Sequence, residues 1–120
     1  MHFIVMLLMG ISLHATSASP QYESGKKLYF SKGCNGCHGV TAGGMNQYPS
    51  LAYRRKAFLD NKLKEYRAKK ASTQLAQMMI PFAIMLKDQE INALTTFLSE
   101  YNEEATRQKS NFSIRGDGGS

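Results

Sequence analysis

The sequence predicts an all-α protein of about four short helices in one small domain. Apolar residues recur at helical spacing in several segments, and no segment alternates apolar and polar residues as a half-buried strand does. The chain has 120 residues, and roughly 80 remain for a compact fold if both ends lie outside it. A domain of this size buries a marginal core and often recruits a metal, a disulfide or a cofactor.

The N-terminal segment, residues 1–18, reads MHFIVMLLMGISLHATSA and contains no Lys, Arg, Asp or Glu. Its apolar run from Phe3 to Leu13 is too short to span a bilayer as a helix. Thr16 and Ala18 are small residues suited to a cleavage site, and a polar stretch follows. We therefore expect a signal peptide that exports the chain to the periplasm. The alternative is a retained anchor, with a loose membrane association.

The first helix is expected within residues 22–32. Leu28 and Tyr29 follow Gly25 by three and four residues, which is helical spacing, and Gly33 ends the run. This helix would deliver the chain to its cysteine pair.

A loop and a second helix are expected next. Residues 39–50 hold three glycines, an asparagine and a proline, which are loop residues. Within residues 53–70, Leu59 and Leu63 are four residues apart, Phe58 and Tyr66 extend the apolar face, and cations occupy the remaining faces.

The third helical segment begins after a capping residue, Ser72 or Thr73. Leu75, Met78 and Met79 would share one face, and Pro81 is expected to break the helical run.

The last helix is the clearest, with one apolar stripe over residues 87–101 and acidic residues near its N-terminal end. The stripe comprises Ile91, Leu94, Phe97, Leu98 and Tyr101. We therefore expect a domain at residues 19–104 and, because residues 105–120 are polar and rich in Gly and Ser, a disordered polar tail there.

The chemistry of the chain is concentrated in Cys34-Asn35-Gly36-Cys37-His38, which contains its only two cysteines. A disulfide between them would close too small a loop to stabilise much, and it would not explain His38. A structural zinc site needs four ligands, and no other Cys or His follows residue 18. A thioredoxin-like pair should follow a strand, whereas a helix is expected here.

Covalent attachment of haem c explains all three residues of the motif. The thiols of Cys34 and Cys37 would add to the vinyl groups of the porphyrin, and the imidazole of His38 would bind the iron. Export agrees with this interpretation, since such haems are attached outside the cytoplasm.

The second axial ligand of the iron is expected to be a methionine. His38 is the only histidine after residue 18, and a thioether favours ferrous iron. Met45 is close to His38 in the sequence and is not expected to reach the opposite face of the haem. Met78, Met79 and Met85 remain as candidates, each of which could instead fill the core.

The chain from Gly25 to Tyr101 resembles the small bacterial class I cytochromes c, including single-domain relatives of the di-haem periplasmic cytochromes. Three stretches carry the resemblance: GKKLYFSKGCNGCHG, the P-x-L-A step at residues 49–52, and LKDQEINALTTFLSEY. The resemblance implies the class I cytochrome c fold, with its short helices around one covalently bound haem.

The resemblance also implies roles for single residues. The ligand methionine of that family tends to precede the leucine of an L-S-D motif by seven residues, which points from Leu86 to Met79, with Met78 and Met85 as alternatives. The carbonyl of Pro49 would accept the Nδ1 proton of His38. Lys87 replaces the usual serine, so Asp88 is expected to cap the last helix.

Two further positions of the family pattern concern the core. Gly25 and Tyr29 would mark the place where the first helix crosses the last, and glycine suits such a close approach of two backbones. Phe97, Leu98 and Tyr101 would lie opposite them.

The function that these residues imply is electron transport. We expect an exported mono-haem carrier, not an enzyme, that exchanges single electrons with respiratory donor and acceptor proteins. The alternatives are a haem enzyme or gas sensor with an open sixth position, and an electron-entry subunit of a membrane respiratory complex.

The partners are expected to present acidic docking surfaces, because the chain has a net charge of +6. No nucleic-acid-binding module is recognisable, and we expect a monomer. Cations concentrate between residues 54 and 70, which makes this region the candidate docking surface, although a charged run is more often an ordinary solvated helix face. These cations are Arg54, Arg55, Lys56, Lys62, Lys64, Arg67, Lys69 and Lys70.

Overall fold

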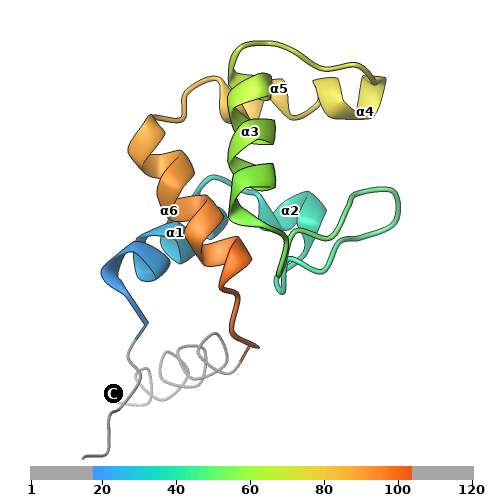
Figure 1. Ribbon diagram of the computed structural model, residues 1–120. Coiled ribbons are helices and arrows are strands. Elements are labelled where there is room, and N and C mark those ends of the chain that lie inside the picture. The colour runs from blue at the N-terminus through green and yellow to red at the C-terminus, as the bar shows by residue number, and fades with distance from the viewer. Residues whose placement is uncertain (1–17, 104–120) are drawn as a thin grey trace, which may run out of the picture.

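The computed structural model describes residues 18–103, and this part of the chain is helical with no strand. The predicted all-α class is confirmed, with six helices in place of about four (Figure 1). Three have 12 residues and three are single turns of four. The long helices are α1 (Pro20–Ser31), α3 (Lys56–Arg67) and α6 (Asp88–Ser99), and the short ones are α2 (Asn35–His38), α4 (Gln74–Gln77) and α5 (Ile80–Ala83).

The core lies where α6 crosses α1 (Figure 1). Tyr29 of α1 and Phe97 of α6 are fully buried, with ring centroids 5.5 Å apart, and Tyr22 meets Phe97 edge to face at 5.2 Å. The Tyr29 hydroxyl donates a hydrogen bond of 2.6 Å to the carbonyl of Gly39. Burial raises the pKa of Tyr29 above its ordinary value, so this donor keeps its proton. The core thus fixes the residue that directly follows the cysteine motif.

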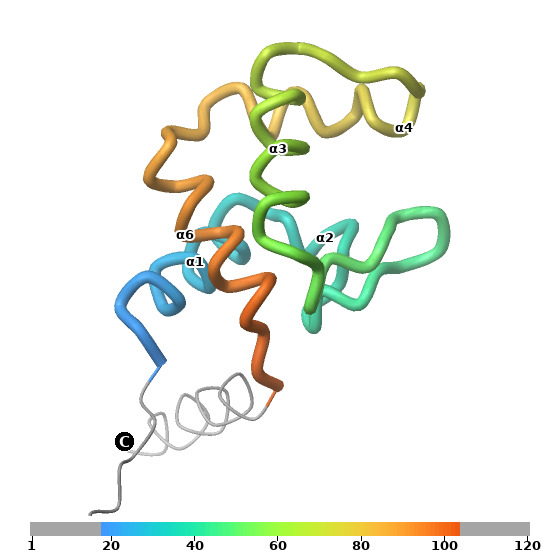
Figure 2. The backbone as a smooth tube through the Cα atoms, in the orientation of Figure 1, coloured from blue at the N-terminus to red at the C-terminus, as the bar shows by residue number. Residues whose placement is uncertain are grey.

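Two hydrogen bonds order the beginning and the end of the described chain. Ser19 caps α1 by accepting from the backbone N–H of Tyr22 at 3.1 Å, and Pro20 occupies the first turn, where no N–H is needed. The Tyr22 hydroxyl accepts from the N–H of Asn102 at 2.9 Å. The Tyr22 side chain therefore links the start of α1 to the segment after α6. Both lie at the lower end of the coloured chain trace (Figure 2).

Helix α3 is tied to α6 and to the segment before it by two of its cations. The Lys56 ammonium donates to Asn92 Oδ1 at 2.5 Å and to Thr95 Oγ1 at 2.9 Å. Arg67 donates to the carbonyl of Leu86 at 3.0 Å and pairs with Asp88 at 2.7 Å. These two cations hold α3 in place. The helical periodicity of the sequence did not predict these contacts.

The expected cap of α6 by Asp88 is wrong. Lys87 is the N-cap residue and Asp88 lies in the first turn, where its carboxylate pairs with Arg67. Glu90 accepts from the Lys87 N–H at 3.1 Å, so the glutamate half of a capping box is present although the serine is missing.

The segment from Thr73 to Leu86 holds two short helices, whereas the sequence predicted one helical run that Pro81 would break. Thr73 caps α4 through its side chain, as expected, but α4 ends at Gln77, before Pro81 is reached. Pro81 lies in the first turn of α5, where its missing N–H costs nothing. Met78 and Met79 therefore lie at the junction between two short helices.

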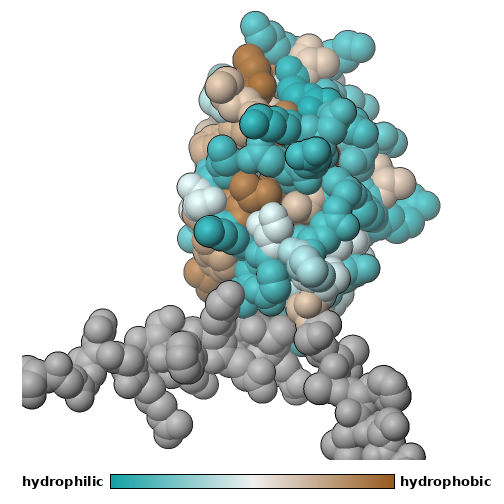
Figure 3. Space-filling view, turned by 90° about the vertical axis from the view of Figure 1, so that its left-hand side faces the viewer, coloured by the Kyte–Doolittle hydropathy of each residue, from teal (hydrophilic) through white to brown (hydrophobic). Residues whose placement is uncertain are grey.

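The side of the molecule formed by α1 and α6 is mainly hydrophilic, with hydrophobic side chains in small separate groups (Figure 3). Within residues 18–103, no helix is long and apolar enough to cross a membrane. The expected tail at 105–120, and the expected signal peptide apart from its last residue, lie outside the described part of the chain.

Candidate haem-binding site

The cysteine motif forms a single helical turn directly after α1. The N–H of Cys34 bonds the carbonyl of Tyr29 at 3.0 Å, so the end of α1 fixes the start of the motif. The N–H of His38 bonds the carbonyl of Cys34 at 3.0 Å, which closes the turn. Positions separated by three and four residues share one face of a helix, so Cys37 and His38 lie on the same face as Cys34.

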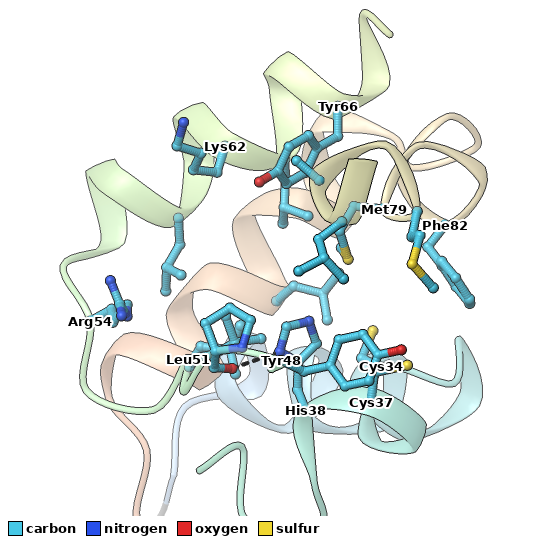
Figure 4. A pocket seen from close by; sticks show the side chains of 18 of the residues that line it. Cys34, Cys37, His38, Tyr48, Leu51, Arg54, Lys62, Tyr66, Met79 and Phe82 are labelled. Carbon is cyan, nitrogen blue, oxygen red and sulfur yellow. Dashed lines mark hydrogen bonds between the residues drawn. The ribbon is translucent and has the colours of Figure 1, made fainter. Parts of the chain in front are cut away.

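The His38 imidazole is buried, with 6% of the residue exposed, and a specific acceptor orients it. Its Nδ1 lies 2.8 Å from the carbonyl oxygen of Pro49, which is the expected contact (Figure 4). Because a carbonyl oxygen only accepts, Nδ1 carries the proton, and Nε2 keeps a lone pair for a metal.

A cavity of about 370 Å³ opens beside the motif, within the roughly 300–1,000 Å³ of small-molecule sites. Cys34, Cys37 and His38 all line it. The rest of its wall is mainly apolar and comes from the loop before α3, from α3 itself, from the α4–α5 segment and from α6. Among these residues are Tyr48, Leu51, Phe58, Leu59, Leu63, Tyr66, Leu75, Phe82, Leu94 and Leu98.

The candidate methionines differ in their placement around the cavity. Met79 is half-buried and lies on the side opposite His38 (Figure 4). Met78 also lines the cavity, with 48% of the residue exposed. Met85 is 76% exposed and is not part of the wall, and Met45 is likewise absent from it. The structure therefore brings Met79 and Met78 to the site, and it leaves Met85 outside.

The two cysteines are free thiols, both half-buried. Burial raises the pKa of the Cys34 thiol, although its backbone hydrogen bond and the nearby Lys32 act in the opposite direction. A neutral sulfur is therefore favoured at this position of an apolar wall, and a thioether sulfur is neutral as well.

Two cations line the cavity on the side away from the cysteines, namely Arg54 and Lys62 (Figure 4). The Arg54 Nε donates to the carbonyl of Ser50 at 2.8 Å, and its guanidinium lies 5.5 Å from the Phe58 ring centroid. Lys62 pairs with Glu65 at 3.0 Å, and that hydrogen bond raises the pKa of the lysine. The sequence predicted both cations to be part of a docking surface. Their position at the cavity could not be predicted, because only the fold shows which side of α3 and of the loop before it meets the cavity.

This set of donors fits a covalently bound haem. Two thiols stand beside an imidazole whose second nitrogen is available, a thioether lies across an apolar cavity, and cations mark the far edge. These features define a small helical protein of the haem c class.

A family model described as Cytochrome c matches residues 22–102, so the chain belongs to the cytochrome c family. Membership implies one covalently bound haem c with its iron. A search of curated proteins found no match.

Proposed function

We propose that the protein is an exported mono-haem cytochrome that carries single electrons between respiratory partners. The observation that carries this proposal is the placement of His38 and Met79 on opposite sides of an apolar cavity beside both cysteines. When bound there, haem c supplies an iron that accepts and releases one electron without bonding a substrate. Family membership supports electron transport in general.

The motif residues hold the cofactor in this proposal. Cys34 and Cys37 form the thioether links, and His38 Nε2 binds the iron. The hydrogen bond from Nδ1 to the Pro49 carbonyl fixes the ring orientation and increases the electron donation of the imidazole.

Met79 would hold the iron through its thioether sulfur, across the cavity from His38. Its half-buried position supports the choice over Met78, which is nearly half exposed at the same helix junction. Met85 fits the role poorly because it lies outside the cavity wall. With His38 and Met79 both bound to the iron, the site would lack the open coordination position that a haem enzyme or gas sensor needs.

Arg54 and Lys62 would bind the haem carboxylates. The carboxylates of this porphyrin lie at the edge opposite its vinyl-derived links, and these two cations line the cavity away from the cysteines. The ion pair of Lys62 with Glu65 is exposed, so the lysine can exchange that partner for a carboxylate of the cofactor at little cost.

The docking surface that we propose is smaller than the whole run of cations between residues 54 and 70. Lys56 and Arg67 hold α3, and Lys64 pairs with Asp60 at 2.7 Å. Arg55, Lys69 and Lys70 are exposed and form no ion pair within residues 18–103.

These three cations are therefore the best candidates for meeting an acidic donor or acceptor, and weak electrostatic docking of a monomer suits rapid exchange. Export to the periplasm, with residues 1–18 as the signal peptide, completes the proposal.

The spectrum of the haem-loaded protein tests the function. A His/Met site predicts the weak far-red charge-transfer band of methionine-ligated ferric haem and slow binding of CO to the reduced protein. Absence of that band together with rapid CO binding would contradict the carrier function and would indicate an enzyme or sensor with an open site. Retention of residues 1–18 and co-purification with a membrane complex would instead identify an electron-entry subunit.

A further inference from the structure

The loop after the cysteine motif folds back onto His38. We call residues 39–51 the strap. The N–H of Gly44 donates to the carbonyl of His38 at 2.9 Å, and the Pro49 carbonyl faces the ring of the same residue at 2.8 Å. Met45 and Tyr48 exchange two backbone hydrogen bonds of 3.2 and 2.8 Å, which close the strap on itself. The backbone and the ring of His38 are thus held by one folded segment.

Gly44 is the most closely packed of the three glycines in the strap. A Cβ atom at Gly44 would lie 2.8 Å from the Tyr48 carbonyl oxygen, 2.8 Å from the Ser50 nitrogen and 3.0 Å from the Pro49 carbonyl carbon. All three are backbone atoms, so no flexible side chain can move away. The φ angle of Gly44 is +85°, which other residues rarely adopt.

A second contact fixes the strap beyond Pro49. The carbonyl of the fully buried Ala42 accepts from the N–H groups of Leu51 at 2.8 Å and Ala52 at 3.0 Å. The Pro49 peptide therefore has the Gly44 backbone against one side and this clamp just after it. Because the Pro49 carbonyl is held on both sides, it cannot move to restore its distance to the imidazole if the packing at Gly44 changes.

We propose that Gly44 is the positioning residue that sets the strength of the His38–Pro49 hydrogen bond and, through it, the electron donation of His38 to the iron. This inference rests on the proposed binding of iron by His38. A strong bond from Nδ1 gives the imidazole more anionic character, which favours ferric iron. Displacing the carbonyl weakens that bond and raises the reduction potential.

Two neighbouring glycines allow a matched comparison in the haem-loaded, full-length protein. Gly44→Ala adds a methyl group against the Pro49 peptide. Gly43→Ala adds the same group where the nearest atom is the Thr41 hydroxyl at 3.2 Å, the end of a side chain. A tenfold loss in the preference of the site for ferric iron corresponds to a rise of about 59 mV. We expect a rise of that order for Gly44→Ala and no change for Gly43→Ala.

A spectroscopic measurement separates this role from a merely structural one. In the reduced, diamagnetic protein, the Nδ1 proton of His38 should resonate at lower frequency in Gly44→Ala and exchange faster with solvent, because its hydrogen bond is weaker. A folded Gly44→Ala protein with an unchanged potential and an unchanged Nδ1 proton would overturn the inference.

The unaltered protein provides a second test that does not depend on the variant folding. The N–H of Gly44 and the Nδ1–H of His38 are closed by the same strap, so one opening event should expose both. Their hydrogen-exchange rates should rise together with added denaturant, and independent responses would contradict the inference. If the proposed function fails, the unaltered protein lacks the His/Met spectrum, whereas failure of the inference leaves that spectrum intact.

Discussion

The backbone of α1 lies directly against that of α6 where Gly25 meets Ala93. A Cβ atom at Gly25 would lie 1.9 Å from the carbonyl oxygen of Ala93 and 2.8 Å from the Cβ of Phe97. The absence of a side chain at this one position lets the two helices approach, and the aromatic core packs around their crossing. The same crossing fixes the end of α1, from which the cysteine motif begins.

Gly25→Ala should therefore destabilise the protein, although alanine favours helices. The helices must separate to admit the methyl group, and overpacking of this kind costs about 1–3 kcal/mol or more. Urea unfolding of the haem-loaded protein measures the change in the free energy of unfolding. Gly36→Ala is the control, because a Cβ at Gly36 meets nothing within 4 Å. Equal stability of the two variants would contradict the close-contact explanation.

Met79→Ala should abolish the far-red band of the ferric protein. The half-buried side chain lies across the cavity from His38, and its removal leaves the iron without a thioether. Met78→Ala and Met85→Ala are the controls and should retain the band. Loss of the band in Met78→Ala alone would transfer the ligand role to that neighbour.

Local pattern predicted the three long helices and the cysteine motif because each depends on residues close together in the sequence. The apolar stripe of α6 matches its buried residues, among them Ile91, Leu94 and Phe97. The motif needs only one helical turn to place its three side chains. The family spacing pointed to Met79, and the fold places that residue in the cavity wall.

Long-range packing decided what the sequence could not predict. The sequence indicated that Lys56 and Arg67 are solvated cations. In the fold, however, Lys56 bonds a residue 36 positions further along the chain, and Arg67 bonds one 19 positions further. The same limit concealed the cavity wall on α3, because helical periodicity does not say which element a face will meet. The Asp88 cap failed for the same long-range reason: the carboxylate of Asp88 pairs with Arg67 of α3, and a charged partner of this kind binds more strongly than a backbone N–H.

Lys56→Met should destabilise the contact between α3 and α6. The substitution keeps the length of the side chain but removes the ammonium that bonds Asn92 and Thr95. Hydrogen bonds of charged groups contribute about 1.5–3 kcal/mol when partly buried, so we expect a loss within that range. Arg55→Met is the control, because Arg55 is exposed and forms no ion pair within the described residues. Thermal unfolding measures the effect. Equal decreases in the midpoint temperature of the two variants would contradict the bridging role of Lys56.

The pairing of Arg67 with Asp88 should make part of the stability depend on pH. The hydrogen bond and charge of Arg67 hold the pKa of Asp88 below its ordinary value of 3.8. A carboxyl group with a lowered pKa stabilises the fold above its ordinary pKa, and this contribution is lost as the pH falls through the folded value. Asp88→Asn should therefore lower the melting temperature at neutral pH, with the difference shrinking below pH 3.8. A constant difference down to pH 2 would contradict the assignment.

The exposed lysines between α3 and α4 should accelerate electron exchange with anions. Lys69 and Lys70 lie in the sequence between Tyr66 and Thr73, both of which line the cavity, so we expect their charges to act near its rim. Replacing both lysines by glutamine should slow oxidation of the reduced protein by hexacyanoferrate(III) at low ionic strength, by roughly two- to fivefold, which is modest for electrostatic steering.

The charge-matched control for these lysines is Lys27→Gln with Lys87→Gln, since both residues are exposed and lie outside the segment between Tyr66 and Thr73. If net charge alone governed the rate, this pair would slow the reaction equally. If position near the rim matters, only the first pair should do so, and the difference should vanish in about 1 M salt, where the screening length falls to roughly 3 Å. Equal rates for the two double variants would remove Lys69 and Lys70 from the proposed docking surface. The far-red band of each variant shows whether its haem site has remained intact.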